Sequence, residues 1–158
     1  MKVLAIDPGT EMSAWCVVID GKPFESGKQL NCEVAEKLRE WKKDDWLLAV
    51  EMIASYGMPV GKEVFDTCVW IGRFCEAWRG GAHRLIYRRE VKLLHCDSVR
   101  ATDATIRAAL IDRFGGKEKA IGKKAAPGPL YGFRGDTWSA LAVALTADRT
   151  PIELEKAA

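Results

Sequence analysis

Apolar residues in the first thirty positions fall into short runs that predict strands. Residues 2–6 and 13–19 (SAWCVVI) are almost wholly apolar, and the Asp20-Gly21 turn predicts a hairpin that returns along residues 23–29. Pro23 lacks an N–H group and favours an edge position for this third strand. We therefore expect an antiparallel three-stranded meander at the start of the chain.

Helical spacing and short buried runs alternate over the next sixty residues. Val34, Leu38 and Trp41 recur at helical intervals and predict a helix over residues 32–42. Residues 46–50 (WLLAV) predict a strand that is covered on both faces. A loop over residues 54–61 precedes a second helix over residues 61–78, and residues 84–87 predict a fifth strand. The expected buried stripe of the second helix is Val64, Cys68, Ile71, Cys75 and Trp78.

Two more helices are expected in the last third of the chain. One spans residues 102–114, with Thr102 or Asp103 as its cap and two glycines at its end. Residues 116–132 are rich in lysine, glycine and proline and predict a mobile loop without regular structure. The final helix spans residues 136–147 and is expected to turn toward the core Trp138, Leu141, Ala142 and Leu145.

Together these elements predict an α/β fold. We expect a mixed five-stranded sheet, in which a three-strand antiparallel meander is followed by parallel strands, with helices on both faces. This domain is expected to span residues 1–150 and to be followed by a C-terminal tail over residues 151–158.

The composition is that of a globular chain, with 158 residues, 17.5 kDa, 48% hydrophobic and 29% charged residues. No apolar run approaches the roughly 20 residues of a membrane span, and residues 1–10 lack the apolar segment of a signal peptide. We therefore expect no membrane partner and no export. The five cysteines are odd in number and include no CxxC pair, which favours a reducing cytoplasm. The net charge of +2 does not by itself point to a partner, and the basic segments 84–100 and 117–124 suit either a solvated face or contact with nucleic acid.

Three acidic residues stand where predicted elements begin or end. Asp7 follows the first strand, Glu51 follows the fourth, and Asp136 opens the last helix. If the first and fourth strands are parallel neighbours, both carboxylates emerge at the same sheet edge, the usual place of α/β sites. Asp7 also suits a turn and Asp136 a helix cap. Glu51 is harder to explain structurally, because a charge that ends a buried strand needs a partner.

Converging carboxylates repel one another unless divalent cations lie between them. Oxygen ligands suit Mg²⁺, which Mn²⁺ can replace. Two such cations in one site stabilise both the attacking and the leaving oxygen of a phosphodiester. Converging carboxylates at Asp7, Glu51 and Asp136 would therefore suit metal-dependent chemistry on a phosphodiester.

The order of these motifs resembles that of the RuvC-type Holliday-junction resolvases, which belong to the ribonuclease H-like superfamily. Residues 1–10 (MKVLAIDPGT) are similar to the first motif, and LLAVEM, which contains Glu51, is similar to the second. Val91-Lys92 with residues 100–107 (RATDATIR) resembles the basic third region, and residues 136–145 (DTWSALAVAL) resemble the last helix. The resemblance covers residues 1–147, and the short chain with its GPLYG loop is similar to the phage-borne branch.

The resemblance implies a ribonuclease H-like fold, a homodimer and metal-dependent, paired nicking of branched DNA. It implies that Asp7, Glu51 and Asp136 bind the metal. The last helix of bacterial members carries two acidic residues three positions apart, whereas Ser139 stands at the second position here. Asp103 lies in the region where the family keeps a site lysine, and it is a candidate for the fourth carboxylate or for a cap of its own helix.

Lysine and arginine contacts with phosphates are expected to hold the DNA, so that binding weakens as salt rises. Lys92 or Arg100 would also neutralise the charge that develops on the cleaved phosphate. The resemblance places Tyr56 near the crossover, where it stacks on an unpaired base or, alternatively, only covers the core. The symmetry of a four-way junction favours a dimer through helix 61–78, with Trp70 as an anchor. The candidate DNA-binding residues are Tyr56, Lys62, Arg88, Arg89, Lys92, Arg100, Lys117, Lys119, Lys123 and Lys124.

Three other functions are compatible with the sequence. A different ribonuclease H-like nuclease, acting on RNA–DNA hybrids, flaps or forks, would use the same carboxylates. A sugar-kinase-like or actin-like ATPase also carries an Asp-x-Gly-Thr loop after its first strand, but it needs two such domains. A catalytically weak or inactive protein that binds branched DNA would account for the missing acid at Ser139.

Overall fold

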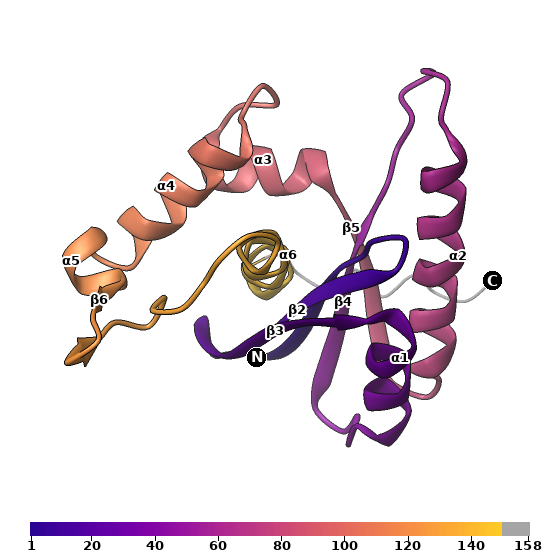
Figure 1. Cartoon of the computed structure of the whole chain (residues 1–158), viewed down its shortest axis with the longest axis horizontal. Coiled ribbons are helices and arrows are strands. Elements are labelled where there is room, and N and C mark those ends of the chain that lie inside the picture. Colours follow the sequence, from indigo (N-terminus) through magenta and orange to yellow (C-terminus); the bar gives the residue numbers. More distant parts are fainter. Residues whose placement is uncertain (150–158) are drawn as a thin grey trace.

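The computed structural model describes residues 1–149, so the expected domain end at residue 150 and the tail over residues 151–158 lie outside the described residues. The main sheet consists of β1 (Lys2–Asp7), β2 (Met12–Ile19), β3 (Lys22–Leu30), β4 (Trp46–Met52) and β5 (Ala82–Tyr87). The strands lie in the order β3-β2-β1-β4-β5 (Figure 1). β2 is antiparallel to β1 and β3, whereas β4 and β5 are parallel to β1. The mixed five-stranded sheet and the edge position of β3 agree with the sequence-based prediction.

Helices cover both faces of the sheet, as predicted. The remaining elements of the described residues are α1 (Asn31–Glu40), α2 (Lys62–Ala77), α3 (Arg88–Cys96), α4 (Asp103–Arg113), α5 (Lys117–Ala120), β6 (Gly122–Lys123), β7 (Ala126–Pro127) and α6 (Thr137–Arg149). In Figure 1, α1 and α2 lie on one side of the sheet and α6 on the other, with α3 and α4 beyond α6. None of the helices within residues 1–149 is long and apolar enough to cross a membrane.

Side chains of β1 alternate between the two faces of the sheet and so enter two separate hydrophobic clusters. Leu4 and Ile6 belong to the cluster under α1 and α2, whereas Val3 and Ala5 belong to the cluster around α6. Asp7 continues the second set. Its side chain therefore lies on the α6 side of the sheet.

Helix α6 is buried on every side. All residues from Thr137 to Ala147 are buried except the half-buried Ser139. The sequence predicts only one buried face for this helix. The buried surface is wider, because α3 and α4 cover the side of α6 that faces away from the sheet. Small side chains in the sheet, Ala5, Ala14 and Ala49, allow the helix to pack closely.

The buried stripe of α2 is rotated from the predicted one. The buried positions are Thr67, Ile71, Phe74 and Ala77, whereas Val64, Cys68 and Cys75 are only half-buried. Both sets have helical spacing, so periodicity alone does not decide which one faces the sheet. As a consequence, Trp70 packs partly against the sheet cluster, and the Arg73 guanidinium lies 4.7 Å from the centroid of its ring.

Two segments have more regular structure than predicted. The periodicity does not predict α3, because only Val91 of its 9 residues is buried. The loop expected over residues 116–132 contains α5 and the β6–β7 hairpin, and its buried Leu130 N–H donates to the Ala120 carbonyl at 2.7 Å. Gly128 lies so close to α5 that a Cβ there would be 2.2 Å from the Lys119 carbonyl oxygen.

A buried polar network holds the loop between β1 and β2. Ser13 Oγ donates to Asn31 Oδ1 at 2.6 Å, Asn31 Nδ2 donates to the Gly9 carbonyl at 2.9 Å, and Gly9 N–H donates to Ser13 Oγ at 3.2 Å. A Cβ at Gly9 would lie 2.4 Å from the Met12 carbonyl oxygen. The network therefore holds in one conformation the segment that directly follows Asp7.

Asn31→Ala is expected to lower the free energy of unfolding by about 1–3 kcal/mol, because it leaves buried groups of Ser13 and Gly9 without a partner. Urea denaturation followed by tryptophan fluorescence measures this change. Ser55→Ala, in the exposed loop after β4, is the control and should change stability by no more than about 0.5 kcal/mol. Equal midpoints for the two variants would contradict a stabilising role for the network.

Candidate active site

Asp7 and Glu51 lie side by side on neighbouring parallel strands. Ile6 pairs with Val50 in the register of β1 and β4, so the next residues along both strands are adjacent. Glu51 lies within β4 rather than directly after it, and it continues the set of Ala49, which faces α6. Both carboxylates therefore point to the same side of the sheet.

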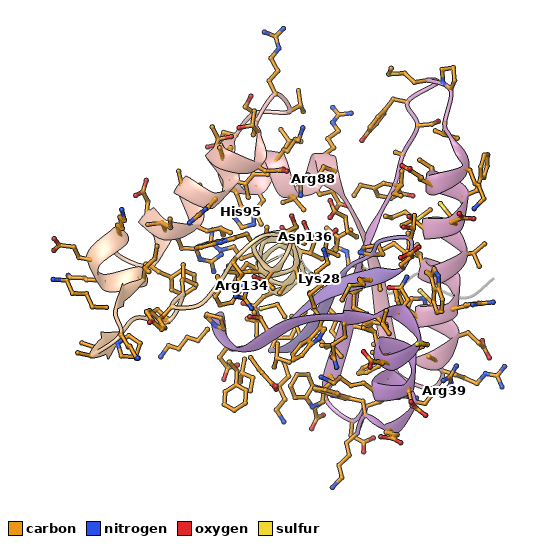
Figure 2. The ribbon with its side chains drawn as sticks, in the orientation of Figure 1. Lys28, Arg39, Arg88, His95, Arg134 and Asp136 are labelled. Carbon is orange, nitrogen blue, oxygen red and sulfur yellow. The ribbon has the colours of Figure 1, made fainter. Side chains whose placement is uncertain are left out.

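Asp136 reaches the same region from the start of α6. It directly precedes this helix, and its Oδ2 accepts a hydrogen bond from Lys28 Nζ of β3 at 2.5 Å. Lys28 pairs with Ala14, which in turn pairs with Asp7, so the three residues form a row across the sheet. Figure 2 shows Lys28 and Asp136 beside α6, and Arg88 lines the same cleft as Asp136.

The electrostatic environment of Asp7 disfavours its charged form. The pKa of this carboxyl is raised from 3.8 to about 8. Burial is the largest cause, and the negative charges of Glu51 and Asp136 add to it, whereas Arg88 opposes them. A cation between these carboxyls would let Asp7 ionise.

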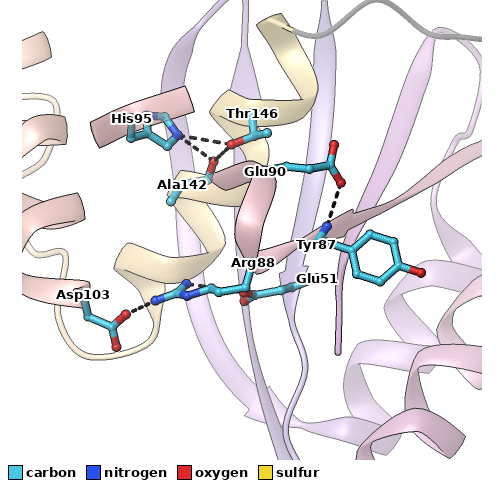
Figure 3. Close-up of polar contacts among 8 residues, drawn as sticks. All are labelled: Glu51, Tyr87, Arg88, Glu90, His95, Asp103, Ala142 and Thr146. Carbon is cyan, nitrogen blue, oxygen red and sulfur yellow. Dashed lines mark hydrogen bonds and ion pairs between the residues drawn. The ribbon is translucent and has the colours of Figure 1, made fainter. Parts of the chain in front are cut away.

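Arg88 connects Glu51 to a fourth acidic residue. As the first residue of α3, it directly follows β5. Its Nη1 lies 3.4 Å from Glu51 Oε1, and its Nη2 donates to Asp103 Oδ1 (Figure 3). The helix cap of α4 is the Thr102 hydroxyl, which accepts from the N–H of Thr105, so the side chain of Asp103 is directed to Arg88 and not to its own helix.

Three adjoining clefts meet at Arg88. The carboxylate cleft has a volume of about 280 Å³, and its lining includes Asp7, Glu51, Tyr56 and Arg88. The aromatic cleft is lined by Tyr56, Arg88, Arg89, Lys92 and Val99. The α4–α6 cleft includes Arg88, Asp103, Arg107, Asp136 and Ser139. Both acidic and basic side chains thus line the clefts around Arg88.

The structure brings together only some of the candidates from the sequence. Those that line these clefts are Asp7, Glu51, Asp103, Asp136, Tyr56, Arg88, Arg89 and Lys92. Lys62 is exposed at the start of α2, where it pairs with Asp66, and Arg100 is exposed between α3 and α4. The lysines of the 117–124 segment lie on α5 and the hairpin, beyond the far end of α4 (Figure 1): Lys117, Lys119, Lys123 and Lys124.

Two cations of the site are absent from the sequence-based candidates. Arg107 follows Asp103 by one helical turn, and its guanidinium lies 4.8 Å from the centroid of the Trp138 ring. Spacing of four residues on one helix is a signal that would have found it. No local spacing in the sequence points to Lys28. It lies opposite Ala14 only because the pairing of β2 with β3 shifts by one residue between Val17 and Val18.

The donors of the site suit a hard divalent cation. Within residues 1–149, no three acidic, histidine or cysteine side chains are close enough to hold one metal ion between them. Mg²⁺, however, is commonly held by one or two carboxylates, with water and substrate phosphate as its other ligands. The raised pKa of Asp7 supports the fit, because a cation would relieve the concentration of negative charge around it.

No protein-family model and no curated protein matches the chain. Among solved structures, Thermus thermophilus RuvC is similar, with a TM-score of 0.69 and 17% identity over 92% of each chain. T. thermophilus RuvC in complex with Holliday junction substrate has a TM-score of 0.65 and 20% identity, over 92% of this chain and 91% of that one. The chain therefore has the RuvC-like, ribonuclease H-like α/β fold.

The raised pKa of Asp7 predicts a pH-dependent loss of stability. The value is 3.8 in the unfolded chain and about 8 in the folded protein, so the folded protein binds more protons between these limits. Its stability then falls as pH rises through this interval. Asp7→Asn removes the cost of burying an ionised carboxylate. This variant should raise the free energy of unfolding at pH 8 by about 1 kcal/mol or more. Near pH 4, where Asp7 is protonated in the folded protein, it should change the free energy of unfolding very little.

Urea denaturation in EDTA across this pH range measures the effect. Asp112→Asn, on the exposed side of α4, is the matched control. If Asp7→Asn stabilised the protein equally at pH 4 and pH 8, the raised pKa of the Asp7 carboxyl would be contradicted.

Ser139 lines the same cleft as Asp136, one turn further along α6. Ser139→Asp would add a carboxylate there and is expected to increase the affinity of the protein for Mn²⁺ severalfold. Calorimetric titration measures this affinity, with Ser139→Ala as the control that adds no ligand. Equal affinities of the two variants would show that this position of α6 faces no metal site.

Proposed function

We propose that this protein is a metal-dependent, structure-selective endonuclease that resolves Holliday junctions and related branched DNA by paired phosphodiester nicks. The observation that carries the proposal is the convergence of Asp7, Glu51 and Asp136 at one edge of a RuvC-like sheet. A solved protein of the same fold, T. thermophilus RuvC in complex with Holliday junction substrate, supports this choice of substrate. The proposed setting is the cytoplasm of a bacterial or phage-infected cell, and the proposed branch of the family is the phage-borne one.

Asp7, with Glu51 on one side and Asp136 on the other, would hold two Mg²⁺ ions, which Mn²⁺ can replace. When bound, the cations lower the pKa of the attacking water and stabilise the leaving oxygen. Asp7 gives up its proton as positive charge enters the site. Lys28 keeps Asp136 directed toward the sheet edge.

The aromatic cleft is the proposed contact with the branch point. Tyr56 is 69% exposed and lies in the loop after β4. An exposed ring between cationic side chains suits an unpaired base together with its phosphates. Arg89 and Lys92 line the same cleft and supply those phosphate contacts, so binding should weaken with salt.

The lysines of α5 and the hairpin would contact DNA far from the cut. They follow the 11 residues of α4, a helix that is about 16 Å long. A duplex arm that leaves the carboxylate cleft along α4 would reach Lys123 and Lys124. These contacts add affinity without reading the branch point.

Paired nicks require two active sites, so a homodimer is part of the proposal. The outer face of α2 carries the exposed residues Phe65 and Val69, at 62% and 55% of their full exposure. Trp70, the anchor expected from the sequence, packs partly against the sheet cluster and is covered by Arg73. Phe65 and Val69 therefore replace it as the proposed interface residues.

A protein that binds branched DNA with weak or no cleavage is the second candidate function. Two observations favour it. Ser139 stands where the resemblance predicts a second acid, and Asp103 is engaged by Arg88. Metal-dependent cutting distinguishes this candidate from the resolvase.

A labelled four-way junction and a matched linear duplex, incubated with Mg²⁺, Mn²⁺ or EDTA, test the proposal. We expect symmetric nicks in opposite strands of the junction alone, and only with metal. Asp7→Asn should abolish cutting and retain junction binding, because phosphate contacts come from other residues. Asp112→Asn serves again as the exposed control.

Tight junction binding without cutting in any metal would contradict the resolvase and favour the binding protein. Equal cutting of flaps and forks would broaden the substrate class to branched DNA in general. Loss of binding and of the folded state together in Asp7→Asn would make Asp7 a structural residue.

A further inference from the structure

We propose that Arg88 is the arginine that contacts the scissile phosphate, and that Asp103 is a positioning residue which holds Arg88 in place and does not bind metal. The inference rests on the proposed function and deepens it. The sequence favours Lys92 or Arg100 as the partner of the phosphate charge and leaves Asp103 as either a fourth metal ligand or a helix cap. The geometry points to a different division of roles.

Arg88 is placed between the carboxylate pair and Asp103. Glu51 is almost enclosed, with a side chain 12% exposed, Arg88 is 29% exposed, and Asp103 is 81% exposed. Figure 3 shows the guanidinium between the two acidic side chains. In this arrangement the positive guanidinium lies between Asp103 and Glu51, so the two carboxylates do not face a common cation site.

The two ends of the guanidinium are held unequally. Nη2 donates a hydrogen bond to Asp103, whereas Nη1 is 3.4 Å from Glu51, longer than a well-formed N–H···O bond. Nη1 is therefore the end that exchanges partners. With a divalent cation held by Glu51, Nη1 would be free to contact a phosphate oxygen while Nη2 stays on Asp103. A planar guanidinium can serve two such acceptors at once, whereas an ammonium group has no such fork.

The backbone that carries Arg88 is held at both ends of α3. At the start, Glu90 Oε1 accepts from the Tyr87 N–H at 2.9 Å, and Glu90 Oε2 accepts from Arg84 at 3.0 Å. At the end, His95 Nε2 lies 3.1 Å from the Ala142 carbonyl of α6. Arg88 thus projects from a fixed point over the carboxylate cleft. Arg100 lies in the exposed turn after α3, where its N–H donates to Ser98 Oγ at 3.2 Å, and it lines none of the three clefts.

Binding of Mn²⁺ to the protein without DNA tests the role of Asp103 directly. Asp103→Asn should bind Mn²⁺ no more weakly than the parent, because no ligand is lost. Arg88→Ala should bind Mn²⁺ more tightly, because Glu51 loses a competing cation. Calorimetric titration gives both affinities, with Asp112→Asn on the same helix as the control. A severalfold weaker affinity in Asp103→Asn, comparable to that of Asp7→Asn, would overturn the proposal.

Junction cleavage tests the role of Arg88. Arg88→Ala should reduce the cleavage rate by about a hundredfold or more, with partial recovery in millimolar guanidinium, which can occupy the vacated place. Arg88→Lys should recover little. Asp103→Asn should lower kcat with little change in KM for the junction. Full activity of Arg88→Ala, or a defect that guanidinium does not relieve although thermal unfolding shows a native fold, would overturn the proposal.

The two measurements separate this inference from the proposed function. A parent protein that cuts no junction in any metal would contradict the nuclease. The Mn²⁺ titrations need no cleavage, and they would still decide whether Asp103 is a ligand or the partner of Arg88.

Discussion

Helix α6 packs closely on the sheet because the residues that meet there are small, and the arrangement of the site depends on this contact. Alanines of β1, β2 and β4 face an alanine-rich helix. Close approach brings Asp136, at the start of α6, to the edge where the two strand carboxylates emerge. On its other side α6 supports α3 through His95, whose pKa is lowered by burial and whose ring contacts the Ala142 carbonyl and the Thr146 hydroxyl. A larger residue at the alanine interface would displace Asp136 and Arg88 together.

Charge compensation is the second constraint, and it follows from the first. Glu51 and Asp103 share Arg88, and Asp136 is paired with Lys28. Asp7 is the most affected group, because burial and its acidic neighbours together raise its pKa. These internal pairs let the fold assemble around several acidic side chains without an external cation. A metal that enters the site must then compete with cations that the protein itself provides.

The proposed roles explain why the motif around Asp103 is ambiguous when it is considered alone. The resemblance implies a site lysine in the region of α4 where Asp103 stands, and an acid where Ser139 stands. In the folded chain Arg88 of α3 brings a positive charge to Asp103, which accepts a hydrogen bond from it. Exchange of a charge between adjacent helices keeps the electrostatics of a site while the residue at each position changes. Similarity of fold at 17–20% identity is compatible with such exchanges.

The sequence by itself determined the five strands of the main sheet, the antiparallel meander and the edge position of β3, whereas the parallel pairing of β1 with β4, which brings Asp7 and Glu51 to one sheet edge, is a contact between distant segments. Those features follow from alternation, turn residues and proline chemistry, which act over a few neighbouring positions. Tertiary structure decided which face of α2 is buried, that α3 is a helix, and that Arg88 joins Glu51 to Asp103. It also decided the place of Lys28: the register shift between Val17 and Val18 pairs Ala14 with Lys28, whereas an unshifted hairpin would pair it with Gly27. Each of these outcomes depends on contacts between segments far apart in the chain, and no local pattern of residues encodes such contacts.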